Sequence, residues 1–293
     1  MTRRHAPRRD DVRVLRPAHE PGLELMRASF FGQRFARHSH EGFGVGVIET
    51  GALGFRYRGE ELVAPAGAVN TVNPDEPHDG YGAGGCGAGG HGAPGWTYRM
   101  FYFPAAFLAR MAEDVAGAPT PLPFLNSGVV RDPELAALLL RAHALHLDHA
   151  AAPGQRLGRD SALLAAFARL ITRHTYAPPN LPRARPEHHA VARIKERLRE
   201  RLDEDLPLAE LARMACLSPW HLVRVFARHT GLTPHAWLMQ QRARAARDLL
   251  LRGTPIAEAA ARSGFADQSH LTRIMKRLTG LTPGQLRNSV QES

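Results

Sequence analysis

Residues Gly231–Pro234 read GLTP, and the same four letters return at Gly280–Pro283. Glycine suits the left-handed residue just past a helix C-terminus, and Thr-Pro suits the N-cap and first position of the next helix. Each copy therefore predicts a short joint between two helices, with its leucine as the apolar anchor. Four matching residues could arise by chance, so the segments upstream must decide whether the repeat is real.

The segments upstream of the two joints correspond along their whole length. The first reads LPLAELARMACLSPWHLVRVFARHTGLTP, and the second reads TPIAEAAARSGFADQSHLTRIMKRLTGLTP, which is one residue longer at its turn. Both contain an early proline, an Ala-Glu pair, a short helix, a turn and a second helix with His-Leu-x-Arg. The apolar residues of each copy recur on one helical face. The pattern predicts two duplicated helix-turn-helix units, at residues 208–229 and 256–278.

The second helix of each unit carries the candidate DNA-binding residues. Its expected N-cap is Ser218 in the first unit and Asp267, or a neighbour, in the second. Arg, Gln, Ser and Thr side chains can contact base edges in a major groove, and a helix N-terminus favours phosphate. A single outward arginine is usually a solvated charge, but Arg224 and Arg273 are equivalent in the two units. The candidates are Ser218, Trp220, His221, Val223, Arg224, Arg228, Gln268, Ser269, Thr272 and Arg273.

One continuous helix is predicted between the two units, from Pro234 to Arg252 and ending at Gly253. A helix of this length spans about 28 Å. It could hold two recognition helices near one DNA turn apart, roughly 34 Å, so that one chain enters two successive major grooves.

Charge is distributed unevenly over the 293 residues, whose formal net charge is +10. Residues 188–293 hold 17 Lys/Arg against 10 Asp/Glu, whereas residues 17–182 hold 13 against 15. A general arginine bias does not explain this asymmetry, which favours a nucleic-acid partner for the C-terminal third. The two cysteines, the lack of a secretory signal and the lack of a long apolar run predict a cytoplasmic protein without membrane partners.

The C-terminal hundred residues resemble the DNA-binding domain of the AraC/XylS family of bacterial transcription regulators. The resemblance is carried by SPWHLVRVFARHTGLTP, RARAARDLLLRG and IAEAAARSGFADQSHLTRIMKRLTGLTPGQLR. It implies that Trp220, Val223 and Arg224 face bases in the first recognition helix, with Gln268, Ser269, Thr272 and Arg273 in the equivalent places of the second. Val223 departs from the polar residue expected there, and it could contact a thymine methyl or leave that base unread.

The first half of the chain is predicted to form a small β-barrel or jelly roll. The runs FGVGVIET, ALGFRYRG, GAVNTVN and TYRMFYF are rich in aromatic and β-branched residues and are bounded by Gly or Pro. Gly32 is followed after five residues by HSH, which holds His38 and His40, and Gly59 is followed after five by PAG. Both patterns resemble halves of the cupin signature, and such sensor barrels commonly precede this DNA-binding domain in the family.

This barrel is expected to bind a small-molecule effector and not to be an enzyme. A catalytic metal would need about three histidines and one carboxylate around one ion. By resemblance the glutamate should stand at Gly44 or Val45 and the last histidine at Asn70, while Glu41 and His78 are off register. We therefore expect no catalytic residues, metal or cofactor, and the alternative is a cupin-fold metalloenzyme joined to a DNA-binding module. The expected ligand-binding residues are His38, His40, His78, Trp96 and Tyr98.

The expected fold class is α+β in two domains, with a cupin-like barrel followed by helices and then an all-α domain. The predicted segments are a basic arm at 1–16, the cupin-like domain at 17–110, a helical region at 111–175, a proline-rich linker at 176–189 and the AraC-type DNA-binding domain at 190–291. Apolar stripes in PELAALLLRAHALHL and LGRDSALLAAFARLITRH either pack on the barrel or pair two subunits. The expected partners are double-stranded promoter or operator DNA, the effector and a second copy of the chain, with RNA polymerase as a further candidate.

Overall fold

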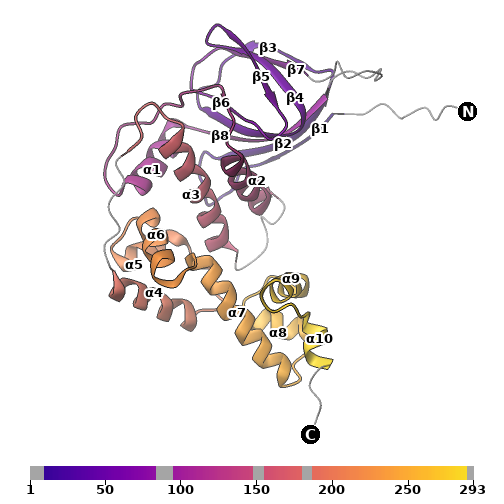
Figure 1. The fold of residues 1–293 in the computed structure, drawn as a ribbon, viewed down its shortest axis with the longest axis vertical. Coiled ribbons are helices and arrows are strands. Elements are labelled where there is room, and N and C mark those ends of the chain that lie inside the picture. The colour runs from indigo at the N-terminus through magenta and orange to yellow at the C-terminus, as the bar shows by residue number, and fades with distance from the viewer. Residues whose placement is uncertain (1–9, 84–94, 148–154, 180–186, 289–293) are drawn as a thin grey trace, which may run out of the picture. The chain divides into compact units, whose positions relative to one another are not determined.

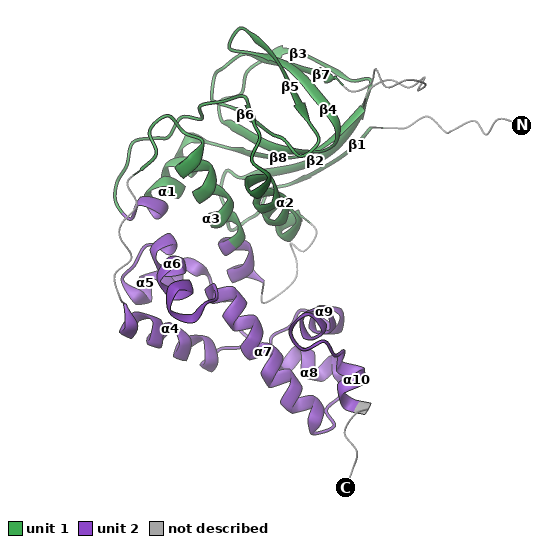
Figure 2. Cartoon of the chain, in the orientation of Figure 1, with its two compact units in different colours: residues 1–113, 118–150, 162–180 green, residues 114–117, 151–161, 181–293 purple. Residues whose placement is uncertain are grey.

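The computed structural model describes residues 10–83, 95–147, 155–179 and 187–288. Two compact units divide the chain: the first comprises residues 1–113, 118–150 and 162–180, and the second comprises 114–117, 151–161 and 181–293 (Figure 2). The predicted fold class is confirmed, because strands occur in the first unit and the C-terminal region is helical. Parts of the predicted arm, linker and C-terminal end lie outside the described residues.

The described strands of the first unit form an antiparallel barrel (Figure 1). One sheet has the order β1-β2-β8-β4-β6-β9, while β5 and β7 pair with the second half of β4, and β3 pairs with β7. The strands are β1 (Asp11–Leu15), β2 (Glu24–Phe31), β3 (Arg34–His38), β4 (Phe43–Tyr57), β5 (Glu60–Pro65), β6 (Val69–Val72), β7 (His78–Gly82), β8 (Gly95–Phe103) and β9 (Val129–Val130).

Strand β4 belongs to both walls of the barrel because it bends in the middle. The two runs that the sequence predicts as separate strands are continuous, with a register shift between Ile48 and Thr50. Gly51 follows at φ +71, and a Cβ there would lie 2.0 Å from the carbonyl oxygen of Gly95. Only glycine fits this bend, where a strand passes from one sheet to the other at an irregularity in its ladder.

Two segments differ from the sequence-based boundaries. Residues Asp11–Leu15, assigned to the basic arm, form an edge strand that pairs along its whole length with β2. The alternating Val and charged residues of this segment suit an exposed edge strand. Helix α1 (Ala105–Ala116) begins inside the predicted cupin-like domain, directly after β8.

Helices cover the outer face of the barrel wall. Helices α2 (Pro133–Leu147) and α3 (Arg156–Arg173) carry the two predicted apolar stripes, and most residues of these stripes are buried within the chain. Phe167 of α3 makes edge contacts with Phe103 of β8 and Phe107 of α1 at ring-centroid distances of 5.1 and 5.2 Å. Because β8 is covered on both faces, it reads as a nearly continuous apolar and aromatic run.

The second unit contains α4 (His188–Glu200), α5 (Leu208–Ala215), α6 (Pro219–Thr230), α7 (Pro234–Leu251), α8 (Ile256–Arg262), α9 (Gln268–Thr279) and α10 (Pro283–Asn288). Helix α7 joins the pair α5–α6 to the pair α8–α9 (Figure 1). Arg242 on α7 is fully buried and donates to the carbonyl oxygens of Leu202 and Glu204 at 2.6 and 3.0 Å. Burial lowers the pKa of this guanidinium to about 10.

Both GLTP joints have the predicted geometry. Gly231 and Gly280 are left-handed C-caps of α6 and α9, at φ 73 and φ 78. Thr233 accepts a hydrogen bond from the amide of Ala236 at the start of α7. At the second joint Thr282 and Gln285 cap each other reciprocally, because each side chain accepts from the other's backbone amide. Among the described helices, none is long and apolar enough to cross a membrane.

Candidate effector cavity and DNA-binding helices

The barrel holds a cavity of about 230 Å³ that is open on one side. Alternation along β8 directs Trp96, Tyr98, Met100 and Tyr102 into it, while the intervening residues face outward. Most of the lining is apolar or aromatic, which is typical of small-molecule sites. The lining residues are Met26, Phe30, Phe35, His38, His40, Gly44, Leu53, Phe55, Asn70, Val72, His78, Asp79, Gly80, Trp96, Tyr98, Met100 and Tyr102.

All five residues predicted to bind the effector lie around this one cavity. His38, His40 and His78 stand on one side of it, and Trp96 and Tyr98 come from β8. The ring centroids of Trp96 and Tyr98 lie 6.3 Å apart in a stacked arrangement. Their role in ligand binding stays a prediction, but the fold brings together residues that are far apart in the sequence.

Two buried polar atoms in the cavity wall have no hydrogen-bond partner among the described residues. They are Oδ1 of Asn70 and Nε1 of Trp96, whose residues are 4% and 1% exposed. A buried polar group without a partner costs on the order of 1–3 kcal/mol. The wall therefore offers one acceptor and one donor that a bound molecule could satisfy.

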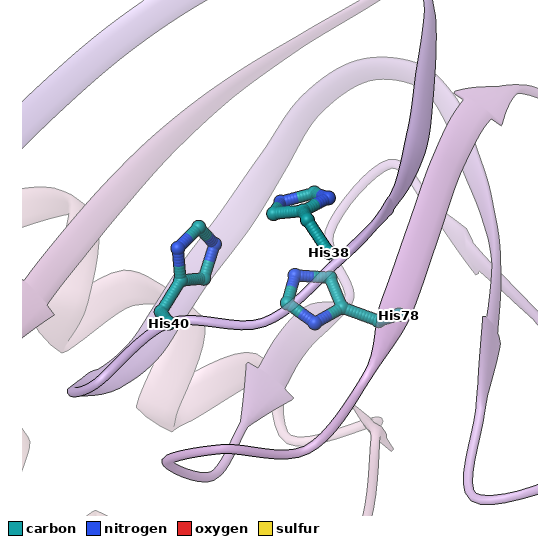
Figure 3. Close-up of side chains that lie close together, drawn as sticks. All are labelled: His38, His40 and His78. Carbon is teal, nitrogen blue, oxygen red and sulfur yellow. The ribbon is translucent and has the colours of Figure 1, made fainter.

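The three histidines face one another (Figure 3). His38 ends β3, His40 follows in the next loop, and His78 begins β7. Ring centroids are 4.5 Å apart for His38 and His78, and 5.0 Å apart for His40 and His78. Burial lowers the pKa of His40 and of His78, and neighbouring imidazoles lower both further. Beside His40, burial raises the pKa of Tyr102 to about 12, so this phenol stays a neutral donor.

Sequence reasoning missed one feature of the wall, the amide oxygen of Asn70, which has no hydrogen-bond partner among the described residues. Asn70 was noted only as the place where a signature histidine was lacking. On β6 it pairs with Gly46 of β4, and its side chain points into the barrel. The available signal was an asparagine inside the short strand VNTV, since a buried Asn needs a polar partner.

The recognition helices begin at the predicted caps. The Ser218 hydroxyl accepts from the amide of His221 at 3.3 Å, and the Asp267 carboxylate accepts from that of His270 at 2.6 Å. Gln268, Ser269 and Arg273 are exposed on α9, and Thr272 is partly exposed. On α6, Arg228 is exposed, while Trp220, Val223 and Arg224 are half-buried.

His221 is the exception among the DNA-binding candidates, because it is only 9% exposed. It lies four residues before Val225, which belongs to the buried face of α6, and helical geometry places the two side chains on one side. This burial does not favour contact between the His221 side chain and DNA, and its role stays a prediction.

Comparison with known proteins gives two family matches that together span both units. Residues 20–167 match the AraC-like ligand binding domain, and residues 211–289 match a helix-turn-helix domain. The arabinose operon regulatory protein of Escherichia coli is 30% identical over 85% of this chain and 79% of its own length. The chain belongs to the AraC family of transcriptional regulators.

Other relatives of this AraC-family regulator cover the chain to different extents. The uncharacterized HTH-type transcriptional regulator YbfI of Bacillus subtilis is 27% identical over 86% of the chain and 87% of its own length. The solved C-terminal domain of AraT, a response regulator from Geobacillus stearothermophilus, is 29% identical over 38% of the chain and 92% of that domain, with a TM-score of 0.34. The predicted function is confirmed at the level of the family: this chain is a DNA-binding transcriptional regulator.

Proposed function

We propose that this regulator places α6 and α9 in two successive major grooves of its operator, and that a small molecule in the barrel cavity controls that binding. The observation that carries the proposal is the pairing, in one chain, of a duplicated helix-turn-helix domain with a barrel whose cavity holds two unsatisfied buried polar atoms. The chain then acts as a regulator and not as an enzyme.

The DNA-binding half of the proposal is supported by helix α7, which connects the two helix-turn-helix pairs. Helix α7 has 18 residues, which is about 27 Å of helix. Its length suits two recognition helices about one DNA turn, roughly 34 Å, apart. Arg224 and Arg273 hold the same position relative to the caps Ser218 and Asp267, six residues after each cap. Their proposed role is contact with guanine edges, for which arginine is the commonest side chain.

The effector half of the proposal is supported by the chemistry of the cavity wall. An apolar body would pack against the aromatic side chains, with a donor aimed at Asn70 Oδ1 and an acceptor aimed at Trp96 Nε1. Such a ligand controls DNA binding only if it has different affinities for two arrangements of the chain. We therefore expect a small, largely apolar molecule with at least two polar groups.

Pairing of two chains, contact with RNA polymerase and a cytoplasmic location belong to the same proposal. The stripes on α2 and α3 are mostly buried in the chain itself, so pairing would use the remaining faces of these helices. Light scattering on the purified chain measures the pairing directly. A single-chain mass at all concentrations, with and without DNA, would contradict it.

The DNA-binding half is tested by selecting sequences from a random duplex library with the purified full-length chain at moderate salt. We expect two conserved half-sites whose centres lie about one helical turn apart. Affinity for the selected operator should fall steeply and linearly on a logarithmic salt scale, because phosphate contacts release counterions. A flat salt response, or a single short site, would contradict the two-groove model.

The effector half is tested by screening small molecules for thermal stabilisation of the chain. A ligand in the cavity should stabilise the native protein but lose much of its effect on Trp96→Phe, which removes the indole N–H and keeps an aromatic ring. Trp237→Phe is the matched control, since Trp237 is a buried tryptophan of α7 in the other unit. Equal losses in both variants would show that the cavity is not the binding site.

A further inference from the structure

We propose that His38, His40 and His78 together bind one divalent transition-metal ion at the wall of the barrel cavity. Imidazole nitrogen suits Zn²⁺, Ni²⁺, Cu²⁺ and Fe²⁺, whereas Ca²⁺ and Mg²⁺ prefer oxygen ligands. The inference rests on the proposed effector function at one point: the ion's remaining coordination position is taken to face the cavity in which the effector would bind.

Strand pairing is what brings the third histidine into place. His78 does not match the cupin signature, whose last histidine should stand where Asn70 is. In the antiparallel pair of β3 and β7, however, His78 lies directly opposite His38. Residues opposite each other in such a pair have neighbouring side chains on one face of the sheet. The sequence-based expectation of a metal-free barrel considered only the positions of the cupin signature. It could not include His78, which becomes a neighbour of His38 only through strand pairing.

The three side chains are close enough for one ion. Their ligand atoms all lie within 4.8 Å of one another. Among the described residues, these three histidines are the group of metal-ligating side chains that are close enough to share an ion. Nitrogens that bind one tetrahedral ion at about 2.0–2.1 Å lie roughly 3.4 Å apart. Closing the site therefore takes an approach of up to about 1.4 Å between ligand atoms, and the exposed side chain of His38 has room to make it.

Backbone carbonyls orient two of the rings for binding. Nδ1 of His38 lies 2.7 Å from the carbonyl oxygen of Ala36, and Nδ1 of His78 lies 3.0 Å from that of Glu76. A carbonyl oxygen only accepts, so both Nδ1 atoms carry the proton and both Nε2 atoms keep a lone pair. Metal-binding histidines typically have this arrangement, in which the second ring nitrogen donates to a carbonyl or carboxylate.

The residue that orients His78 is itself fixed by several contacts. The Glu76 carboxylate accepts from the guanidinium of Arg58 at 2.9 Å and from the hydroxyl of Tyr57. The amide of Asn73 donates to it as well, at 3.3 Å. These contacts hold the turn before β7, so the position of His78 does not depend on the loop alone. A preorganised ligand of this kind raises metal affinity because less ordering is needed on binding.

The donor set indicates what would share the ion. Three neutral imidazoles leave its double positive charge uncompensated, and Asp79, the carboxylate in the lining, already accepts from the backbone amide of Arg56 at 2.7 Å. An anionic oxygen donor, such as a carboxylate or phenolate, would complete the coordination and place its apolar part against the aromatic wall. The effector class that follows is a small aromatic or aliphatic acid.

The first experiment measures metal binding without DNA or effector. The full-length chain, purified without a histidine tag and stripped with a chelator, is titrated with Co²⁺ and Zn²⁺ by calorimetry. We expect one equivalent per chain, together with the intense visible absorption of Co²⁺ in a site of low coordination number. Mg²⁺ should give no heat of binding. Absence of a one-equivalent site for both transition ions would overturn the inference.

Variants then locate the site. Loss of a residue that only orients a metal ligand typically lowers metal affinity by about 10–100-fold. His38→Ala and His78→Ala each remove a ligand itself, so each should lower metal affinity by more than that. His189→Ala, which removes an exposed histidine of α4, is the matched control and should bind as the parent chain does. His38 is exposed, so its variant should keep the circular dichroism of the parent and answer the question even if His78→Ala misfolds. A loss shared by the control, or no loss in a folded His38→Ala, would overturn the assignment.

The two proposals fail in different measurements. A chain that binds one metal ion, but whose operator affinity responds to no small molecule, keeps the metal site and loses the effector function. If operator affinity responds to an effector equally well after chelation, the effector function stands and the metal ion is not part of the effector site. Benzoate is a suitable first probe, because enhanced binding to the Zn²⁺-loaded chain over the stripped chain tests the anionic ligand class directly.

Discussion

At the scale of single residues, the Asp132 carboxylate accepts hydrogen bonds from three residues of the first unit. It accepts from the amide of Leu135 at the start of α2, from Nε and Nη2 of Arg169 on α3, and from His174. The Arg169 guanidinium, followed by the Leu135 amide and the His174 ring, holds the pKa of Asp132 well below its usual range. One side chain therefore caps one helix and ties it to the next.

Asp132→Asn should destabilise the first unit. Asparagine keeps the cap but loses the charge, and hydrogen bonds to charged groups contribute about 1.5–3 kcal/mol each. Because the folded-state pKa lies below the unfolded value, the aspartate's stabilisation is fully present above about pH 4–5 and is lost as the pH falls further. Urea unfolding at neutral pH should show the loss, and the difference between variant and parent should shrink in acid.

Glu134→Gln provides the control for that prediction. Glu134 also pairs with Arg169, at 2.6 Å, but its side chain is 69% exposed. Exposed ion pairs contribute between nothing and about 1 kcal/mol, so this variant should unfold almost as the parent does. A cost as large as that of Asp132→Asn would mean that the burial of Asp132 is not what makes it important.

The roles of some residues could be predicted from their neighbours in the sequence, and the roles of others could not. The caps Ser218 and Asp267 follow from residue type and position alone, because capping depends on four or five consecutive residues. The place of His78 beside His38 depends on the pairing of two strands far apart in the chain, which the sequence pattern does not encode. The burial of His221 depends on what packs against α6, which residue type and position alone do not give.

At the scale of secondary structure elements, the two GLTP joints act as rigid stops between successive helices. Gly231→Ala should cost about 1–2 kcal/mol, since residues with a side chain are disfavoured by that amount in the left-handed region. The open space around Gly231 means that the backbone and not a clash causes the loss. Thermal unfolding followed by the helical circular dichroism signal measures it.

Gly284→Ala is the matched control for the joint. Gly284 also has nothing near its Cβ position, but it lies in the first turn of α10 without the left-handed backbone. Alanine is the better helix former, so this variant should be neutral or slightly more stable. Equal losses in both variants would show that the left-handed conformation is not the reason that glycine stands in the joint.

Helices and strands with a regular spacing of apolar residues could be predicted from the sequence. Strands that depend on hydrogen bonding to a partner strand could not. The sequence predicts α2 over Pro133–Leu147 because its stripe is regular. It misses β1, a five-residue edge strand without a buried face that is defined by its partner β2. It divides β4 at the glycine that in fact bends a continuous strand between two sheets.

At the scale of the whole molecule, the second unit contains the helix-turn-helix twice, and we propose that each copy reads its own place on one DNA. If α6 and α9 each enter their own groove, Arg224→Ala and Arg273→Ala should relax sequence preference at two base positions about one helical turn apart. Each change should cost roughly 1–3 kcal/mol of binding, the value of one good bidentate base contact. Because the two sites are distant and share no partner on the DNA, the double variant should lose about the sum.

Arg252, the C-cap of α7, is the control for that pair of variants. It lies outside both recognition helices, and if it contacts phosphate, Arg252→Ala should weaken binding to all sequences alike. The measurement is binding of each variant to a library in which every operator position is varied, at one fixed salt concentration. Relaxed preference at the same base pair in both recognition-helix variants would mean that the two helices share one groove. Unchanged preference in both would mean that neither arginine reads a base, and in either case the repeat serves something other than adjacent grooves.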